Sequence, residues 1–175
     1  MLKKIGIIAA LSTMALLVVA PSASAAIVST INPANAPTGT HFQRGSATCT
    51  VSGVTVTCSS YQLAGVGNAD ATASLSANWT ATVDCFNPGN NPNNPIESHT
   101  QSFSDDVTTG ELSPKNGKLT VPSLTGDPSE VVDDALCPNP NWDPRIRPGT
   151  LTLNSFTYTL TFDGFGGAFI TITGP

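Results

Sequence analysis

The segment from Thr72 to Phe86 alternates strictly between apolar and polar side chains, and this pattern constrains the fold more than any other. A β-strand produces such a period of two when one of its faces is buried and the other meets solvent. We therefore predict a long strand with its apolar side chains in the core: Ala73, Leu75, Ala77, Trp79, Ala81, Val83 and Cys85.

The rest of the chain contains short β-prone runs separated by Gly, Pro and Asn, and only 11% of its residues are charged. This composition predicts an all-β fold, and we expect an immunoglobulin-like antiparallel β-sandwich with one short helix. The helix is expected from Asp127 to Cys137, because Asp127-Pro128-Ser129-Glu130 has the form of an N-cap with a capping box. It would turn four side chains inward: Val131, Val132, Ala135 and Leu136.

Three local features refine this prediction. Residues 96–103 form a weaker strand that suits an edge of a sheet. Asn116-Gly117 is a strong signal for a two-residue hairpin turn. Between Thr150 and Phe162 the apolar phase slips, so an extra residue at Asn154-Ser155, a β-bulge, is expected to restore one face.

The first 25 residues are interpreted as a signal peptide. Lys3 and Lys4 precede an apolar run that ends at Pro21, and Ala23-Ser24-Ala25 fits a signal peptidase site. Residues 26–175 then form a single β-sandwich domain, secreted and without a membrane anchor. The full chain has a net charge of −5, and removal of the two lysines makes it −7. Five dispersed basic residues against twelve acidic ones argue against nucleic acid as a partner.

Four cysteines in an exported domain predict two disulfides. With Gly53-Val54 as a type II′ turn, Cys49 lies opposite Cys58 at a position where the two Cα atoms come close. A rival register with Ser52-Gly53 as the turn would set these cysteines diagonally. Three pairings are possible, and we favour Cys49–Cys58 and Cys85–Cys137. The spacings do not suit zinc, and no CxxC motif is present.

Candidate catalytic residues are few. Only His41 and His99 could act as bases at neutral pH, and neither lies in a known catalytic motif. We therefore predict no catalytic residue, metal site or cofactor. Trp142 and Phe165 lie in loop or turn segments and are the candidate ligand contacts; a Trp142 folded over the end of the sandwich is the alternative.

The pattern CTVSGVTVTC…LAGVGN…WTATVDC…CPNPNW resembles a group of small, functionally uncharacterised β-rich proteins secreted by high-GC Gram-positive bacteria. The resemblance covers most of Cys49 to Trp142 and implies export, the four cysteines and a β fold. It implies no activity and supplies no catalytic residue.

These features favour a secreted, non-enzymatic binding or structural module. The partner is not identified by the sequence; a cell-surface protein or a polysaccharide is the kind we consider. A carbohydrate-binding module is the first alternative, and a secreted hydrolase or a protease inhibitor the second.

Overall fold

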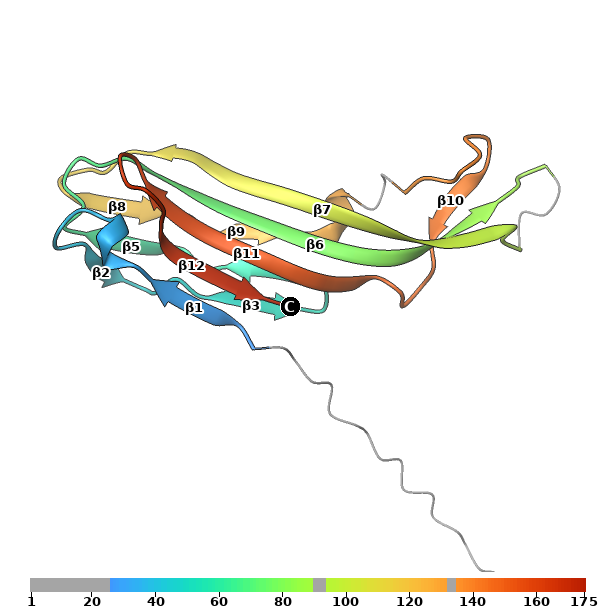
Figure 1. The fold of residues 1–175 in the computed structure, drawn as a ribbon, viewed down its shortest axis with the longest axis horizontal. Helices are drawn as coiled ribbons and strands as arrows, with labels where there is room; N and C mark the ends of the chain where they lie inside the picture. The colour runs from blue at the N-terminus through green and yellow to red at the C-terminus, as the bar shows by residue number, and fades with distance from the viewer. Residues whose placement is uncertain (1–25, 90–93, 132–134) are drawn as a thin grey trace, which may run out of the picture.

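The computed structural model describes residues 26–89, 94–131 and 135–175, so the predicted signal peptide lies outside the described residues. Within them the fold is all-β (Figure 1). The strands are Val28–Ile31 (β1), His41–Arg44 (β2), Cys49–Ser52 (β3), Thr55–Cys58 (β4), Tyr61–Ala64 (β5), Ala71–Phe86 (β6), Glu97–Leu112 (β7), Lys118–Val121 (β8), Leu124–Gly126 (β9), Asp143–Ile146 (β10), Thr152–Phe162 (β11) and Ala168–Gly174 (β12).

The larger sheet is antiparallel and is built around β6. On one side β6 pairs with β7; on the other it pairs first with β11 and then, near its C-terminal end, with β10. Strands β12 and β1 continue the sheet beyond β11. Among the described strands β7 pairs with β6 alone, so it forms a 16-residue edge of this sheet.

The second layer consists of two three-stranded sheets, β2-β5-β8 and β3-β4-β9. The chain passes from one small sheet to the other between β2 and β3 and again between β4 and β5, and a backbone hydrogen bond from the Ser59 N–H to the Thr48 carbonyl joins these two connecting segments. In Figure 1 these strands lie behind the larger sheet. The two small sheets therefore continue each other along the length of the larger one.

Trp79 shows how the layers are joined. Its side chain is fully buried, and its indole N–H donates a 2.7 Å hydrogen bond to the Val54 carbonyl in the β3–β4 turn. All seven side chains predicted to face inward from β6 are buried. The period-two prediction for this strand is confirmed.

A second, smaller group of buried residues lies under the C-terminal part of β6, beyond the three-stranded sheets. It contains Ala81, Val83, Cys85, Phe103 and Ala135. Here the second layer is not a sheet but irregular chain from the region after β9, which the Cys85–Cys137 disulfide attaches to β6. The covalent link thus holds residues 135–142, which form no strand ladder.

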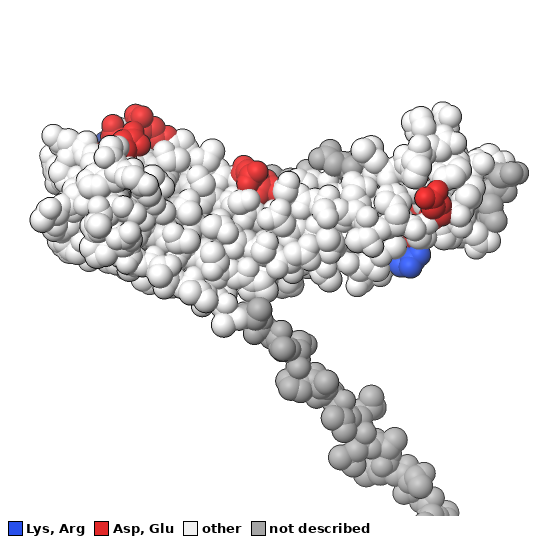
Figure 2. Space-filling view, viewed as in Figure 1, with Lys and Arg blue, Asp and Glu red and all other residues white. Residues whose placement is uncertain are grey.

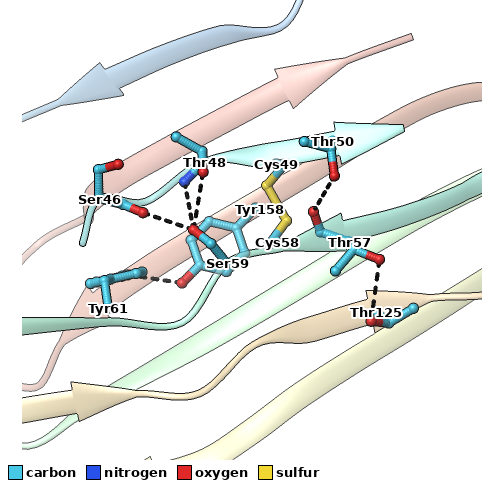
Figure 3. Close-up of a disulfide and its surroundings, with 10 residues drawn as sticks. All are labelled: Ser46, Thr48, Cys49, Thr50, Thr57, Cys58, Ser59, Tyr61, Thr125 and Tyr158. Atoms are coloured by element: carbon cyan, nitrogen blue, oxygen red, sulfur yellow. Dashed lines mark hydrogen bonds between the residues drawn. A yellow bond between two sulfur atoms is a disulfide. The ribbon is translucent and has the colours of Figure 1, made fainter. Parts of the chain in front are cut away.

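Both predicted disulfides are present, and no free cysteine remains. Cys49 pairs with Cys58 in the predicted register, with the Cα atoms 4.0 Å apart, and Gly53 has a φ of 62° at the first turn position. Figure 3 shows this disulfide bridging β3 and β4, next to the hydrogen bonds that Ser59 makes with Ser46 and Thr48. The rival register is excluded.

The β-bulge and the hairpin turn are also confirmed. The β11–β6 register shifts between Leu153 and Ser155, which leaves Asn154 as the extra residue. Asn116 and Gly117 have φ values of 54° and 71°, as a type I′ turn requires. By contrast, a strand was expected only over residues 96–103, whereas the observed strand β7 runs from Glu97 to Leu112 and has 16 residues.

The prediction of a short helix from Asp127 to Cys137 is wrong in the described residues. A single 3-10 turn, Pro128–Glu130 (η2), forms instead, and a second one, Pro33–Asn35 (η1), follows β1. Asp127 does cap η2, accepting a hydrogen bond from the Ser129 N–H. Leu136, expected inside, is 69% exposed. Residues 132–134, including Val132, lie outside the described residues. The disulfide from Cys137 to Cys85 of β6 and the hydrogen bond from the Leu136 N–H to Gln101 of β7 hold residues 135–137 in an irregular path.

Candidate ligand-binding groove

Two adjoining hollows lie on the outer face of the β2-β5-β8 sheet. The larger, of about 410 Å³, is lined by Gln62, Leu112, Ser113, Lys115, Lys118 and Thr120. The smaller, of about 250 Å³, is lined by Arg44, Gly45, Ser60, Tyr61, Gln62 and Thr120. Gln62 and Thr120 line both, so the two hollows adjoin at this pair of residues. We call these lining residues the β5 groove.

The floor of the β5 groove follows from the pairing of three strands. Gln62 in β5 lies opposite Thr120 in β8, and its Nε2 atom donates a 3.1 Å hydrogen bond to Oγ1 of Thr120. On the other side Gln62 lies opposite Arg44 in β2. Side chains opposite each other in a sheet share a face. Arg44, Gln62 and Thr120 therefore form one outward row across the sheet.

A β-bulge in β2 places Arg44 in this row. The β2–β5 register shifts between Phe42 and Arg44, which leaves Gln43 as an extra residue. Without that insertion, strand alternation would set Arg44 opposite Tyr61 and turn it toward the core. Phe42 keeps the inward position and contacts Tyr61 edge to face, with ring centroids 5.4 Å apart.

The Asn116-Gly117 turn places two lysines beside each other at the end of the groove. Lys115 and Lys118 exchange backbone hydrogen bonds of 2.8 and 3.1 Å across the turn. Residues at such a position are direct cross-strand neighbours, and like charges there destabilise a hairpin. A negatively charged group between the two ammonium groups would relieve this repulsion.

The five basic residues of the described chain divide into two groups by their ion pairs. Arg145 forms an ion pair with Asp143 and Arg147 with Asp84, each at 2.7 Å. Within the described ranges, Arg44, Lys115 and Lys118 take part in no ion pair, and all three are exposed. The positive charge that is not neutralised by a neighbour therefore lies in the β5 groove.

The opposite face of the molecule differs in charge. Figure 2 shows the side on which the larger sheet lies in front: most of it is uncharged, acidic groups form separate patches, and basic groups are visible mainly near the right-hand end. At that end of β6, hydrogen bonds from Arg147 and then Ser98 hold the pKa of the Asp84 carboxyl below its ordinary value. The charges of Asp84 and Arg147 therefore neutralise each other, and Ser98 is hydrogen-bonded to both.

The two aromatic residues proposed as ligand contacts lie apart from the β5 groove and are half-buried. Trp142 packs against the smaller core group, in the position expected of a cover for that end of the sandwich. Phe165 packs against the main core and contacts Phe162, with ring centroids 6.3 Å apart. A ligand contact at either residue stays a prediction.

The two histidines belong to different sheets. His41 lies in β2, on the outward face beside the groove, and its Nδ1 is 2.8 Å from the Gly39 carbonyl oxygen. His99 lies in β7, and its Nδ1 is buried without a hydrogen-bond partner. In the part of the chain that the structure describes, neither ring is hydrogen-bonded to a serine or a carboxylate.

Two further observations concern the described ranges 26–89, 94–131 and 135–175. They contain no group of three or more His, Cys, Asp or Glu side chains placed to hold a metal ion. No helix in them is long and apolar enough to span a bilayer.

Sequence reasoning missed the β5 groove. Its basic residues come from strands that are distant along the chain, and the bulge at Gln43 that turns Arg44 outward interrupts no apolar run. The signal that could have found it is the Lys-Asn-Gly-Lys sequence at 115–118, because a type I′ turn necessarily sets its two flanking residues side by side.

No family model, curated protein or solved structure matches the chain. The immunoglobulin-like assignment and the resemblance to secreted bacterial proteins therefore stay predictions.

Proposed function

We propose that this chain is an exported, non-enzymatic binding protein that holds an acidic ligand in the β5 groove. The observation that carries the proposal is the convergence of Arg44, Lys115 and Lys118 on two adjoining hollows of an acidic protein, with no ion pair to any of the three among the described residues. Opposite charges in a hollow raise the local concentration of a charged ligand and guide its approach.

Export is supported by the two disulfides and by the N-terminal segment. Disulfides persist in oxidising surroundings outside the cytoplasm, and both pairs are formed here. A binding role is favoured over an enzymatic one because the groove contains donors and positive charges but no nucleophile paired with a base. Its lining groups can hold an anion by hydrogen bonds and charge without changing it.

Retention on a carboxymethyl matrix at neutral pH tests the proposal. The protein as a whole repels such a matrix, since its sequence pI is about 4.6, so retention requires a local concentration of positive charge. We expect the disulfide-bonded protein to be retarded at low ionic strength and released as salt screens the interaction.

Single substitutions locate the surface responsible. Lys118→Gln and Arg44→Gln should each reduce retention, whereas Arg145→Gln, which removes the same charge from the larger sheet, should not. A wild-type protein that is not retarded at low salt, or an equal loss in Arg145→Gln, would refute the proposal.

A further inference from the structure

The groove has positive charge at both ends and neutral hydrogen-bonding groups between them. Lys115 and Lys118 line only the larger hollow, and Arg44 lines only the smaller one. Arg44 and Lys118 are two strands apart, about 10 Å across the sheet, and offset by two residues, about 7 Å, along it. A ligand that pairs with the positive charge at both ends is therefore longer than one small anion and needs a negative group at each end.

The middle of the groove suits hydroxyl groups. It presents the Gln62 amide and the Thr120 hydroxyl, with Ser60 and Ser113 at the two sides. Amide and hydroxyl side chains both donate and accept hydrogen bonds, so they match ligand groups that do the same. A ligand that alternates carboxylates with hydroxyls would satisfy both parts of the groove.

An extended peptide fits this surface less well. Peptides that bind to sheets add a strand at an edge, where backbone groups are unpaired. The groove instead lies over β5, which is hydrogen-bonded to β2 on one side and to β8 on the other. Its ligand must be recognised by side chains alone.

Neutral sugars also lack their usual partner here. Their rings commonly stack on exposed aromatic faces, but the one aromatic residue that lines the groove, Tyr61, is only 4% exposed. Its hydroxyl is turned into the core, where it lies 2.8 Å from the Tyr158 hydroxyl. Attraction must therefore come from charge and hydrogen bonds.

The geometry points to an acidic polysaccharide, with carboxylates carried on its sugar rings, as the ligand of the β5 groove. This inference rests on the proposed function and specifies its ligand. Arg44 would bind one carboxylate through its planar guanidinium, and the lysine pair another as point charges. Gln62 and Thr120 would bind ring hydroxyls between them.

Binding to four soluble polymers tests this assignment: polygalacturonate, dextran, poly-L-glutamate and inorganic polyphosphate. We expect polygalacturonate to bind most tightly, with an affinity that falls as salt is added, and dextran not to bind. Arg44→Gln and Lys118→Gln should each weaken polygalacturonate binding about tenfold or more, since each removes a charged hydrogen-bond donor. Arg145→Gln should leave it unchanged, and the unfolding midpoint of each variant confirms that it is folded.

The alternative results separate the two proposals. If poly-L-glutamate or polyphosphate binds more tightly than polygalacturonate, and Lys118→Gln weakens that binding, the polysaccharide assignment is wrong while acidic-ligand binding stands. If dextran binds as well as polygalacturonate, charge is not the basis of recognition and the assignment is likewise wrong. If none of the three polyanions binds at low salt, both proposals are overturned.

Discussion

The hydroxyl groups of Tyr61 and Tyr158 lie 2.8 Å apart in the core and form a hydrogen bond between the two layers of the sandwich (Figure 3). Tyr61 comes from β5, beneath the β5 groove, and Tyr158 from β11 in the larger sheet. Both side chains are at most 4% exposed, so each hydroxyl depends on the other. The floor of the proposed site is thus fixed to the opposite sheet by a polar contact.

Removal of one hydroxyl of this pair should destabilise the fold more than removal of both. Tyr158→Phe leaves the Tyr61 hydroxyl buried without a partner, which costs about 1–3 kcal/mol, whereas replacing both partners by apolar groups can be nearly neutral. Urea unfolding of Tyr61→Phe, Tyr158→Phe and the double variant measures the coupling free energy. Additive effects of the two substitutions would show that the hydroxyls do not interact.

The same pair should resist ionisation. Burial raises the pKa of Tyr61, with a further contribution from Tyr158, and burial also raises the pKa of Tyr158. A raised pKa in the folded state means that the neutral form stabilises the fold below the ordinary tyrosine pKa, and this stability is lost as the pH rises above it. The chain has only these two tyrosines. We expect the ultraviolet absorbance of tyrosinate to appear together with unfolding, and not before it, in an alkaline titration followed in parallel by circular dichroism.

Acid should remove the stabilisation provided by Asp84. Because its pKa is lowered, chiefly by hydrogen bonds from Arg147 and Ser98, the folded state takes up the proton less readily than the unfolded chain. Its contribution is present above the ordinary pKa of about 4 and is lost as the pH falls through the lowered value.

We therefore expect Asp84→Asn to lower the thermal unfolding midpoint at neutral pH and to differ less from the wild type as the pH falls. Ser98→Ala removes one of the two hydrogen-bond donors and should show a smaller change. A difference between Asp84→Asn and the wild type that is independent of pH would contradict this role for the carboxylate.

The two disulfides should contribute unequally to stability. The chain-entropy relation gives about 2–3 kcal/mol for the short loop closed by Cys49–Cys58 and about 4 kcal/mol for the longer one closed by Cys85–Cys137. Sequence separations of 9 and 52 underlie this difference. Denaturant unfolding of the paired Cys→Ser variants measures both contributions. Loss of the longer disulfide should also expose Ala135 to hydrogen exchange, since it removes the covalent link between Cys137 and the β6 strand against which Ala135 packs.

Gly65 should tolerate alanine less well than Gly53 does. Both have positive φ values, 75° and 62°, so alanine carries a similar backbone cost of about 1 kcal/mol or more at each position. At Gly53 the added methyl group would meet open space, whereas at Gly65 it would overlap the Gly39 carbonyl group. The free energies of unfolding of Gly65→Ala and Gly53→Ala isolate the steric part. Equal losses would show that the Gly39 segment can move away.

Most of the local pairing could be predicted from the sequence, because it depends on residues close together in the chain. Period-two patterns predict the alternation in β6, the register that joins Cys49 to Cys58, and the bulge at Asn154. A register shift of one residue would move every apolar side chain to the other face of the sheet, so these patterns allow one register. The pairing of Cys85 with Cys137 then followed from elimination among few alternatives.

The length of strand β7 was underestimated because its buried face carries no clear apolar pattern. Its inward positions include His99, Gln101 and Asp105 as well as Phe103, so no apolar series marks the buried face. The helix-start residues around Asp127 do form a capped turn, but only the three residues of η2. Beyond it, the Cys85–Cys137 disulfide and the contact with β7 fix the backbone of residues 135–137. The β5 groove depends on how distant strands meet, which no local pattern records.

The long edge formed by β7 has a consequence for how copies of this protein meet. Unpaired strand edges invite a second molecule to add its own strand. Within its sixteen residues β7 carries Glu97, Asp105, Asp106 and Glu111 and neither lysine nor arginine. Two molecules that joined there would bring the exposed carboxylates of one copy, Glu97, Asp106 and Glu111, close to those of the other. We expect mutual repulsion at this border to oppose growth of the sheet by edge-to-edge addition of further copies.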